Sequence, residues 1–111
     1  MIWNSDRVAD HTIIVYGLKR IDNPNYSVVC TLIEDGDTTR VHGLLSNADL
    51  GVKGFFSLWK YLKTIVTTKY LYFIVVEKVK NVYMMYLNPE ESGKIKTFNG
   101  FDAYYFKIRF K

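Results

Sequence analysis

The fold is decided by residues 46–87, which run SNADLGVKGFFSLWKYLKTIVTTKYLYFIVVEKVKNVYMMYL. Over residues 52–66 the apolar side chains recur three and four positions apart. This spacing predicts an amphipathic helix whose apolar side packs against a sheet. The apolar positions are Val52, Phe55, Phe56, Trp59, Leu62 and Val66, and the polar side is expected to hold Lys53, Ser57, Lys60, Thr64 and Thr67.

The start of this helix is a candidate ligand site. Ser46 and Asn47 are residue types that cap helices, and two glycines follow in the first turn. Free backbone N–H groups and the helix dipole together hold phosphate oxygens at such a junction. The candidate phosphate-binding residues are therefore Gly51, Val52, Lys53 and Gly54, and the alternative is an ordinary helix start without a ligand.

Residues 70–76 (YLYFIVV) form an almost continuous apolar run, which predicts a central strand covered on both faces. A helix of this length before it allows the strand to pair parallel to the strand that precedes the helix. Residues 77–87 keep helical spacing although their composition also suits a strand, so a short helix is favoured there. Pro89 ends it, because proline lacks a donor and restricts Asn88.

Hairpins flank this centre. Residues 11–19, 26–33 and 39–45 predict an antiparallel meander of three strands, joined by turn residues at 22–25 and by Asp35-Gly36. After a polar loop at 90–93, residues 94–98 and 103–111 predict a closing hairpin around Asn99-Gly100. In its second strand, Tyr104, Phe106, Ile108 and Phe110 alternate with Tyr105, Lys107, Arg109 and Lys111. The expected fold class is therefore α+β, as one domain over residues 1–111.

Composition limits the class of protein. The single cysteine, Cys30, excludes an internal disulfide and is expected to be a small buried hydrophobe. No apolar run approaches the roughly 18 residues of a membrane span, and residues 1–11 are too polar for a signal peptide. We therefore expect no membrane association, and a location in the cytoplasm fits a chain without a disulfide.

The net charge of +4 is unevenly distributed. Residues 1–52 hold four Lys or Arg against seven Asp or Glu, whereas residues 53–80 hold six Lys and one Glu. A chain of this kind attracts an anionic partner through its second half, although a solvated lysine face is the simpler interpretation.

The sequence contains no catalytic or metal-binding cluster that spacing alone identifies. His11 and His42 lie far apart and have no carboxylate or thiolate at ligand spacing, so no metal is expected. Neither a Walker loop nor a dinucleotide fingerprint occurs.

The order of elements nevertheless resembles a known family. Meander, loop, amphipathic helix, central strand, short helix and closing hairpin follow one another as in the GNAT core, that of the acetyl-CoA-dependent N-acetyltransferases. The resemblance covers residues 11–110 and is greatest to small, degenerate versions found in tailed phages. It implies a mixed sheet that opens between the strand before the helix and residues 70–76, with any pantetheine in the gap.

The same resemblance implies candidate roles for an acyltransferase. Gly51 to Gly54 would hold the pyrophosphate of acetyl-CoA, and Tyr86 would protonate the departing thiolate. The base would be Glu34, Glu77 or a water. Two positions depart from the family pattern: Asp49 stands where the family has Gln or Arg, and Val79 stands where it often has Asn.

Two classes of function follow. The first is a small non-enzymatic interaction protein on a degenerate GNAT-like scaffold, phage-encoded and without cofactor, that binds a host or virion protein. The resemblance to phage proteins implies that it is located in the cytoplasm of the host cell or in the virion. Its candidate contacts are Lys53, Lys60, Lys63, Tyr105, Lys107 and Arg109. The alternative is an acetyl-CoA-dependent N-acyltransferase. Nucleic-acid binding is a lesser alternative, since basic residues interleaved with Tyr contact phosphates and stack on bases.

Overall fold

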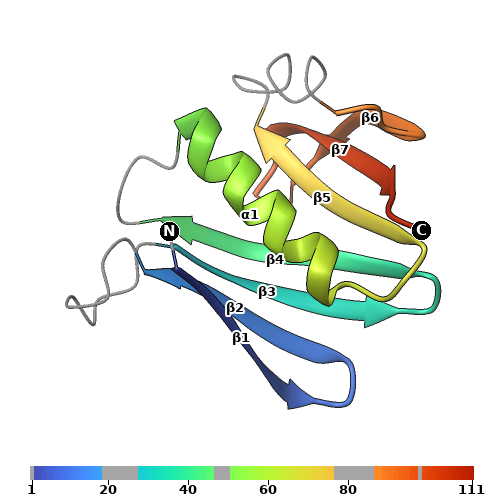
Figure 1. The fold of residues 1–111 in the computed structure, drawn as a ribbon. Coiled ribbons are helices and arrows are strands. Elements are labelled where there is room, and N and C mark those ends of the chain that lie inside the picture. The colour runs from blue at the N-terminus through green and yellow to red at the C-terminus, as the bar shows by residue number, and fades with distance from the viewer. Residues whose placement is uncertain (1, 19–27, 47–50, 77–86, 98) are drawn as a thin grey trace.

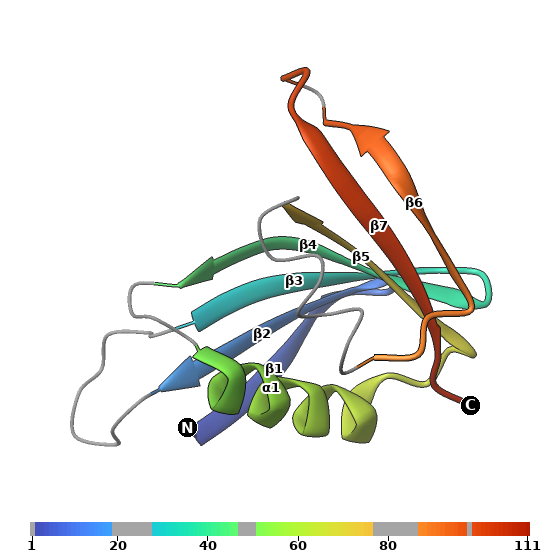
Figure 2. The same cartoon turned by 90° about the horizontal axis from the view of Figure 1, so that it is seen from above.

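The structure is a computed structural model that describes residues 2–18, 28–46, 51–76, 87–97 and 99–111. These residues form one mixed sheet of seven strands, with one helix among them that packs against one face (Figures 1 and 2). The spatial order of strands is β1-β2-β3-β4-β5-β7-β6. The elements are β1 (Ile2–Ala9), β2 (Thr12–Leu18), β3 (Val28–Asp35), β4 (Thr38–Ser46), α1 (Gly51–Ile65), β5 (Tyr70–Val76), β6 (Glu91–Lys96) and β7 (Asp102–Arg109).

Strand pairing is antiparallel except between β4 and β5, which run parallel on either side of the α1 connection. The mixed α+β sheet and the parallel pair confirm the fold class expected from the sequence. The full order of elements expected is not confirmed. The short helix expected at residues 77–87 falls almost wholly outside the described residues, as does the turn at 22–25.

The first hairpin corrects the expected meander, which has four strands and not three. Residues 2–9, where the sequence predicted no strand, form β1 and pair with β2 from Ile2↔Leu18 to Ala9↔Thr12. Contacts with α1 explain why so polar a segment is a strand. Trp3 Nε1–H donates to Ser57 Oγ at 2.8 Å, and Ser5 Oγ lies 2.9 Å from Tyr61 OH.

The helix buries the side that its periodicity predicts, with two corrections. Leu58, Trp59, Leu62 and Val66 are buried against the sheet, and each fully buried leucine contributes about 1.5–3 kcal/mol. Phe56 is instead 36% exposed. Ser57, expected on the solvent side, is half-buried because β1 lies next to it. Ser46, considered as the cap, ends β4 opposite Val28, and α1 begins five residues later.

The core lies between α1 and one face of the sheet. Its members alternate along β2, β3, β5 and β7, which places every second residue toward the helix. Leu32, Leu71 and Phe106 are at most 1% exposed. Cys30 belongs to this core, and burial raises the pKa of its thiol to about 11, so the prediction of a buried hydrophobe is confirmed.

Two other expectations about strands are wrong. Residues 91–93 are the start of β6 and not a loop, because they pair with β7 through Glu91↔Lys107 and Gly93↔Tyr105. Strand β5 is central, but the described residues cover only one of its faces. Leu71, Phe73 and Val75 are buried under α1, whereas Ile74 on the other face is 48% exposed. Within the described residues, no helix is long and apolar enough to cross a membrane.

Candidate functional site

Strands β4 and β5 separate along their length. Only three registered pairs join them, from Thr38↔Tyr70 to Arg40↔Tyr72. Beyond these pairs β4 continues to Ser46 beside β3, and β5 continues to Val76 beside β7. The sheet therefore opens between them toward the end where α1 begins (Figure 1). This opening is the one that the sequence resemblance implied.

The closed end of the opening is held by partly buried hydrogen bonds. Thr68 Oγ1 donates to the Tyr70 carbonyl at 3.0 Å and lies 2.6 Å from Thr39 Oγ1. Since a hydroxyl has one proton, Thr39 is the donor to Thr68. The Tyr70 N–H also donates to the Asp37 carbonyl at 2.9 Å. These bonds fix the start of β5 against β4, so the two strands diverge from a defined point.

A bulge in β4 lies at the point of divergence. Val29 faces Leu45 and Thr31 faces His42, which leaves two β4 residues opposite Cys30. Gly43, in the bulge, has a φ of 58°, a conformation that a side chain disfavours. A bulge of this kind bends a strand and increases its twist. The bend accompanies the separation of β4 from β5.

The residues proposed for acyl-CoA are only partly described. The backbone of α1 starts at Gly51, no acidic residue lies in its first turn, and Lys53 is exposed. Asp49, Glu77 and Tyr86 lie outside the described residues. Glu34, one of the candidate bases, lies opposite Thr39 at the closed end of the opening. Its carboxylate accepts hydrogen bonds from Arg7, which lowers its pKa and makes it a weaker base.

The face of the sheet opposite α1 is a second candidate surface, called the open face below. It includes Tyr70, Tyr72 and Ile74 of β5 together with Tyr105 and Lys107 of β7, which follow from the register of the two strands. The β6–β7 hairpin inclines away from β1–β4 toward this side, so the open face is concave (Figure 2). Among the described residues, α1 is the only helix, and it covers the other face.

A row of stacked side chains crosses the open face. The Arg40 guanidinium lies 4.9 Å from the centre of the Tyr72 ring, and the Tyr72 and Tyr105 rings stack at 5.6 Å. The Tyr105 ring continues over Gly93, where a Cβ atom would come within 2.8 Å of it. Tyr105 OH donates to Glu91 at 2.9 Å, which raises the pKa of the phenol. Beside this row, Lys107 Nζ lies 4.5 Å from the centre of the Tyr70 ring.

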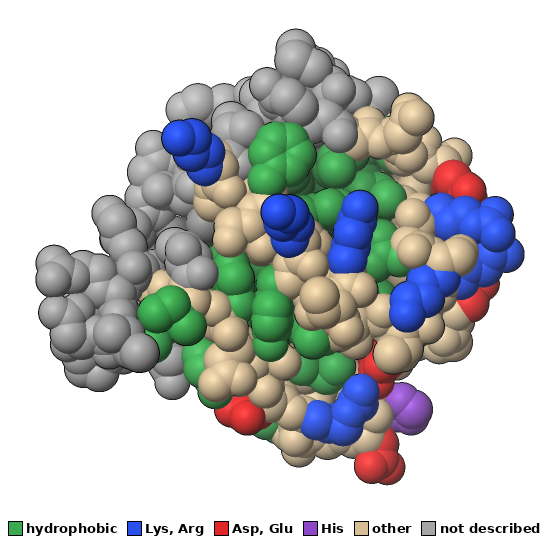
Figure 3. All heavy atoms as spheres, in the orientation of Figure 1, with side chains coloured by type: hydrophobic (Ala, Val, Ile, Leu, Met, Phe, Trp, Pro, Cys, Tyr) green, Lys and Arg blue, Asp and Glu red, His purple; other side chains and the backbone are tan. Residues whose placement is uncertain are grey.

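The six predicted partner-binding residues do not form one surface. Lys53, Lys60 and Lys63 are exposed on α1, whereas Tyr105 and Lys107 lie on the opposite face of the sheet. Figure 3, seen from the α1 side, shows separate cationic side chains among apolar ones over the helix, with acidic side chains toward the margins. Arg109, at the end of β7, lines a hollow together with Lys60 and Lys63.

Sequence reasoning missed Arg40, Tyr72 and Ile74 of the open face. A sequence signal for the open face exists in β5, where residues of the open face, Tyr70, Tyr72 and Ile74, alternate with buried ones, Leu71, Phe73 and Val75. This alternation was not apparent because all six residues are aromatic or aliphatic, so the run also fits a strand buried on both faces.

Comparison with solved structures gives the chain its fold relatives. It matches the ribosomal-protein-S18-alanine N-acetyltransferase of Escherichia coli with a TM-score of 0.67 and 12% identity, over 93% of this chain and 72% of that one. It matches a putative acetyltransferase of the GNAT family from Desulfovibrio desulfuricans with a TM-score of 0.61 and 9% identity, over 91% and 70%.

A chimera of the spermidine N-acetyltransferase SpeG from Vibrio cholerae and hSSAT gives a TM-score of 0.61 at 14% identity, over 92% of this chain and 71% of that one. Neither a family model nor a curated protein matches the sequence. At these identities the similarity concerns architecture alone. The opening between β4 and β5, the helix that follows β4 and the closing hairpin are thus parts of a GNAT-like fold.

Proposed function

We propose that the chain is a small non-enzymatic interaction protein, of the phage-encoded type, that binds a host or virion protein through the open face of its GNAT-like sheet. The observation that supports this is the exposure of a central strand. Ile74 of β5 is 48% exposed although β5 has a strand on either side. Sheets in stable domains bury their apolar faces against a further layer, and helices commonly provide it. A partner's amphipathic helix is the occupant that fits this face.

The charges of the open face define the partner further. Arg40 and Lys107 lie over tyrosine rings, so the cations border an aromatic surface. Carboxylates at the margins of an otherwise apolar helix would complement them. Arg40 lies 3.7 Å from Asp35, and Tyr105 OH donates to Glu91 at 2.9 Å, so the open face holds acidic groups as well. This mixture suits a protein better than the uniform negative charge of a nucleic acid.

The test compares proteins that co-purify with the unaltered chain, with Ile74→Glu and with Val8→Glu from a bacterial lysate. Both substitutions place a glutamate at an exposed apolar position, but Val8 lies at the far end of β1, and is 56% exposed. We expect a stoichiometric partner that the unaltered chain and Val8→Glu retain and Ile74→Glu loses, although all three have the same circular dichroism spectrum. A partner that Ile74→Glu retains, or no stoichiometric partner at all, contradicts the proposal.

A second function, an acetyl-CoA-dependent N-acyltransferase, is favoured by the opening between β4 and β5. The pairs end at Arg40↔Tyr72, so both strands have backbone groups that face the gap and not each other. Pantetheine would lie there, Gly51 to Gly54 would hold the pyrophosphate, and Tyr86 would protonate the thiolate with Glu77 or a water as base. Asp49 in the phosphate loop opposes this function, because a carboxylate beside a pyrophosphate is repelled.

Calorimetry with acetyl-CoA separates the two functions. The interaction protein is expected to give no heat of binding and no thermal shift at millimolar acetyl-CoA. Micromolar binding that Gly54→Trp abolishes and Gly54→Ala retains would establish the acyl-CoA site in place of our first proposal. The alanine variant is the control for the helix, in which alanine is favoured over glycine by up to about 1 kcal/mol.

A further inference from the structure

A hollow on the α1 side of the sheet is separate from both the open face and the β4–β5 gap. It lies between the middle of α1 and the end of β7 and has a volume of about 500 Å³. Its walls are Phe56, Trp59, Ile108 and Phe110, with Leu87 at its border. A volume of this order falls within the range of small-molecule sites, which are about 300–1,000 Å³ and mostly apolar.

The aromatic floor of the hollow is held in place by neighbours. The Trp59 ring packs edge-on against Phe73 at 5.2 Å and against Phe110 at 5.6 Å, and it stacks on Phe55 at 5.3 Å. Trp59 is only 8% exposed. The floor is therefore preformed, so a ligand would not have to order it.

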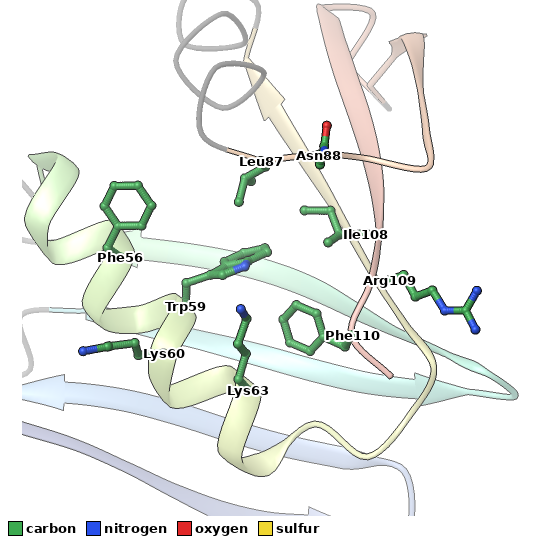
Figure 4. A pocket seen from close by; sticks show the side chains of 9 residues that line it. All are labelled: Phe56, Trp59, Lys60, Lys63, Leu87, Asn88, Ile108, Arg109 and Phe110. Carbon is green, nitrogen blue, oxygen red and sulfur yellow. The ribbon is translucent and has the colours of Figure 1, made fainter.

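The charges that line the hollow are all positive. Lys60, Lys63 and Arg109 contribute to the lining, and no aspartate or glutamate is among the described residues that do. Figure 4 shows the Lys63 side chain extending toward the hollow beside Trp59 and Phe110, whereas Lys60 and Arg109 point away from it. Arg109 is already engaged by Glu90 at 3.8 Å and by the Lys111 carbonyl at 3.0 Å. Lys63 has no carboxylate within 4.0 Å among the described residues.

We infer that this α1–β7 hollow binds a small amphipathic organic anion, an aliphatic chain or ring with one carboxylate. The apolar body lies on Trp59, Ile108 and Phe110, and the carboxylate accepts hydrogen bonds from Lys63. Because Lys63 is the one cation that extends toward the hollow in Figure 4, the hollow favours a ligand with a single negative charge at the end of an apolar chain or ring. This ligand is additional to the protein partner and does not depend on it.

Octanoate is the probe, and 1-octanol, of equal chain length and without charge, is its control. In a Trp3→Phe variant Trp59 is the only tryptophan, so its fluorescence reports occupancy of the hollow. Octanoate is expected to change this emission saturably and to bind about tenfold more tightly than 1-octanol, because a charge-assisted hydrogen bond contributes that much. If Trp3→Phe does not fold, calorimetry of octanoate and 1-octanol on the unaltered chain takes its place.

Substitutions then locate the charge. Lys63→Gln should weaken octanoate binding about tenfold and leave 1-octanol unchanged, and Lys63→Arg should retain octanoate. Lys96→Gln, on β6 and outside the hollow, should have no effect. Equal affinity for the two probes, no saturable signal, an unchanged Lys63→Gln or a weakened Lys96→Gln each contradicts the inference. Competition between octanoate and acetyl-CoA also contradicts it, because the hollow would then belong to the acyl-CoA path.

Discussion

Two glycines of this sheet are each covered by an aromatic ring from the neighbouring strand. The Trp3 ring covers Gly17, where a Cβ atom would lie 2.6 Å from the ring, and the Tyr105 ring covers Gly93. Each ring packs directly on the glycine backbone, and a Cβ atom at that position would prevent this contact. Trp3 also donates its N–H to Ser57, so Gly17 indirectly fixes the contact between β1 and α1.

We therefore expect Gly17→Ala to destabilise the fold by about 1–3 kcal/mol, the usual cost of overpacking a closely packed site. Urea denaturation followed by circular dichroism measures the free energy of unfolding. Gly93→Ala is the matched control, because Trp3 packs against the hydrophobic core whereas Tyr105 lies on the open face. A Gly17→Ala loss no larger than that of Gly93→Ala would show that the Trp3 ring adapts at little cost.

A single carboxylate links β3 to the first hairpin in a pH-dependent way. Arg7 donates to Glu34 at 2.7 and 3.3 Å, and this lowers the pKa of the Glu34 carboxyl below its ordinary value of 4.5. A lowered pKa in the folded state means that the ionised form stabilises the fold above that ordinary value. The contribution disappears as the pH falls through the lowered pKa.

Glu34→Gln is accordingly expected to be less stable than the unaltered chain at pH 7, by no more than the small amount typical of exposed ion pairs. The difference should vanish well below pH 4.5, where both chains lack the charge. Urea midpoints measured across this range provide the test. A difference that persists in acid would assign the effect to packing of the side chain and not to its ionisation.

The helix α1 packs against strands on both sides of the β4–β5 gap and so joins them in one hydrophobic core. Leu62 is 1% exposed and belongs to the core cluster, whereas Phe56 on the same helix is 36% exposed. Leu62→Ala is expected to cost about 2–5 kcal/mol, because it leaves a cavity among β-strand side chains. Phe56→Ala should cost much less, and thermal denaturation of the two variants gives the comparison. Equal losses would mean that the helix is anchored differently from the arrangement described above.

The elements that the sequence predicts correctly are those whose pattern has one dominant period. The helix α1 follows from apolar spacing, and β7 follows from strict alternation between Tyr104 and Phe110. Strand β1 could not be predicted in this way. Its sequence, IWNSDRVA, is mostly polar, and it is a strand because of partners far away in the chain, Ser57 and Tyr61.

Across the described residues as a whole, the sheet has two parts, β1–β4 and β5–β7, which the short β4–β5 ladder joins. Strands β3 and β5 each have a strand on both sides, whereas β6 at one border has a single partner. In amide hydrogen exchange, the N–H groups of Leu32 and Phe73 should exchange far more slowly than those of β6, because they open only with the core. Equal protection of β6 and β3 would instead indicate that the sheet opens as one unit.

The candidate site was predictable at this scale only in part. The opening between β4 and β5 follows from the order of elements and from the resemblance to the GNAT core. The sequence did not predict on which face of the molecule each charge lies. Lys63 lies on the α1 side and Lys107 on the open face because α1 packs against one particular face of the sheet. Periodicity assigns sides within an element, and it contains no information on which side of one element meets which side of another.

The two edge strands of the sheet, β1 and β6, differ in charge. On β6, Lys94 and Lys96 are exposed, and lysine at a sheet border discourages pairing with a second chain through repulsion and desolvation. On β1, the first four residues, Ile2 to Ser5, have no charge. Self-association in concentrated solution is therefore expected to begin by strand addition at β1, and Asn4→Lys is the change that would suppress it.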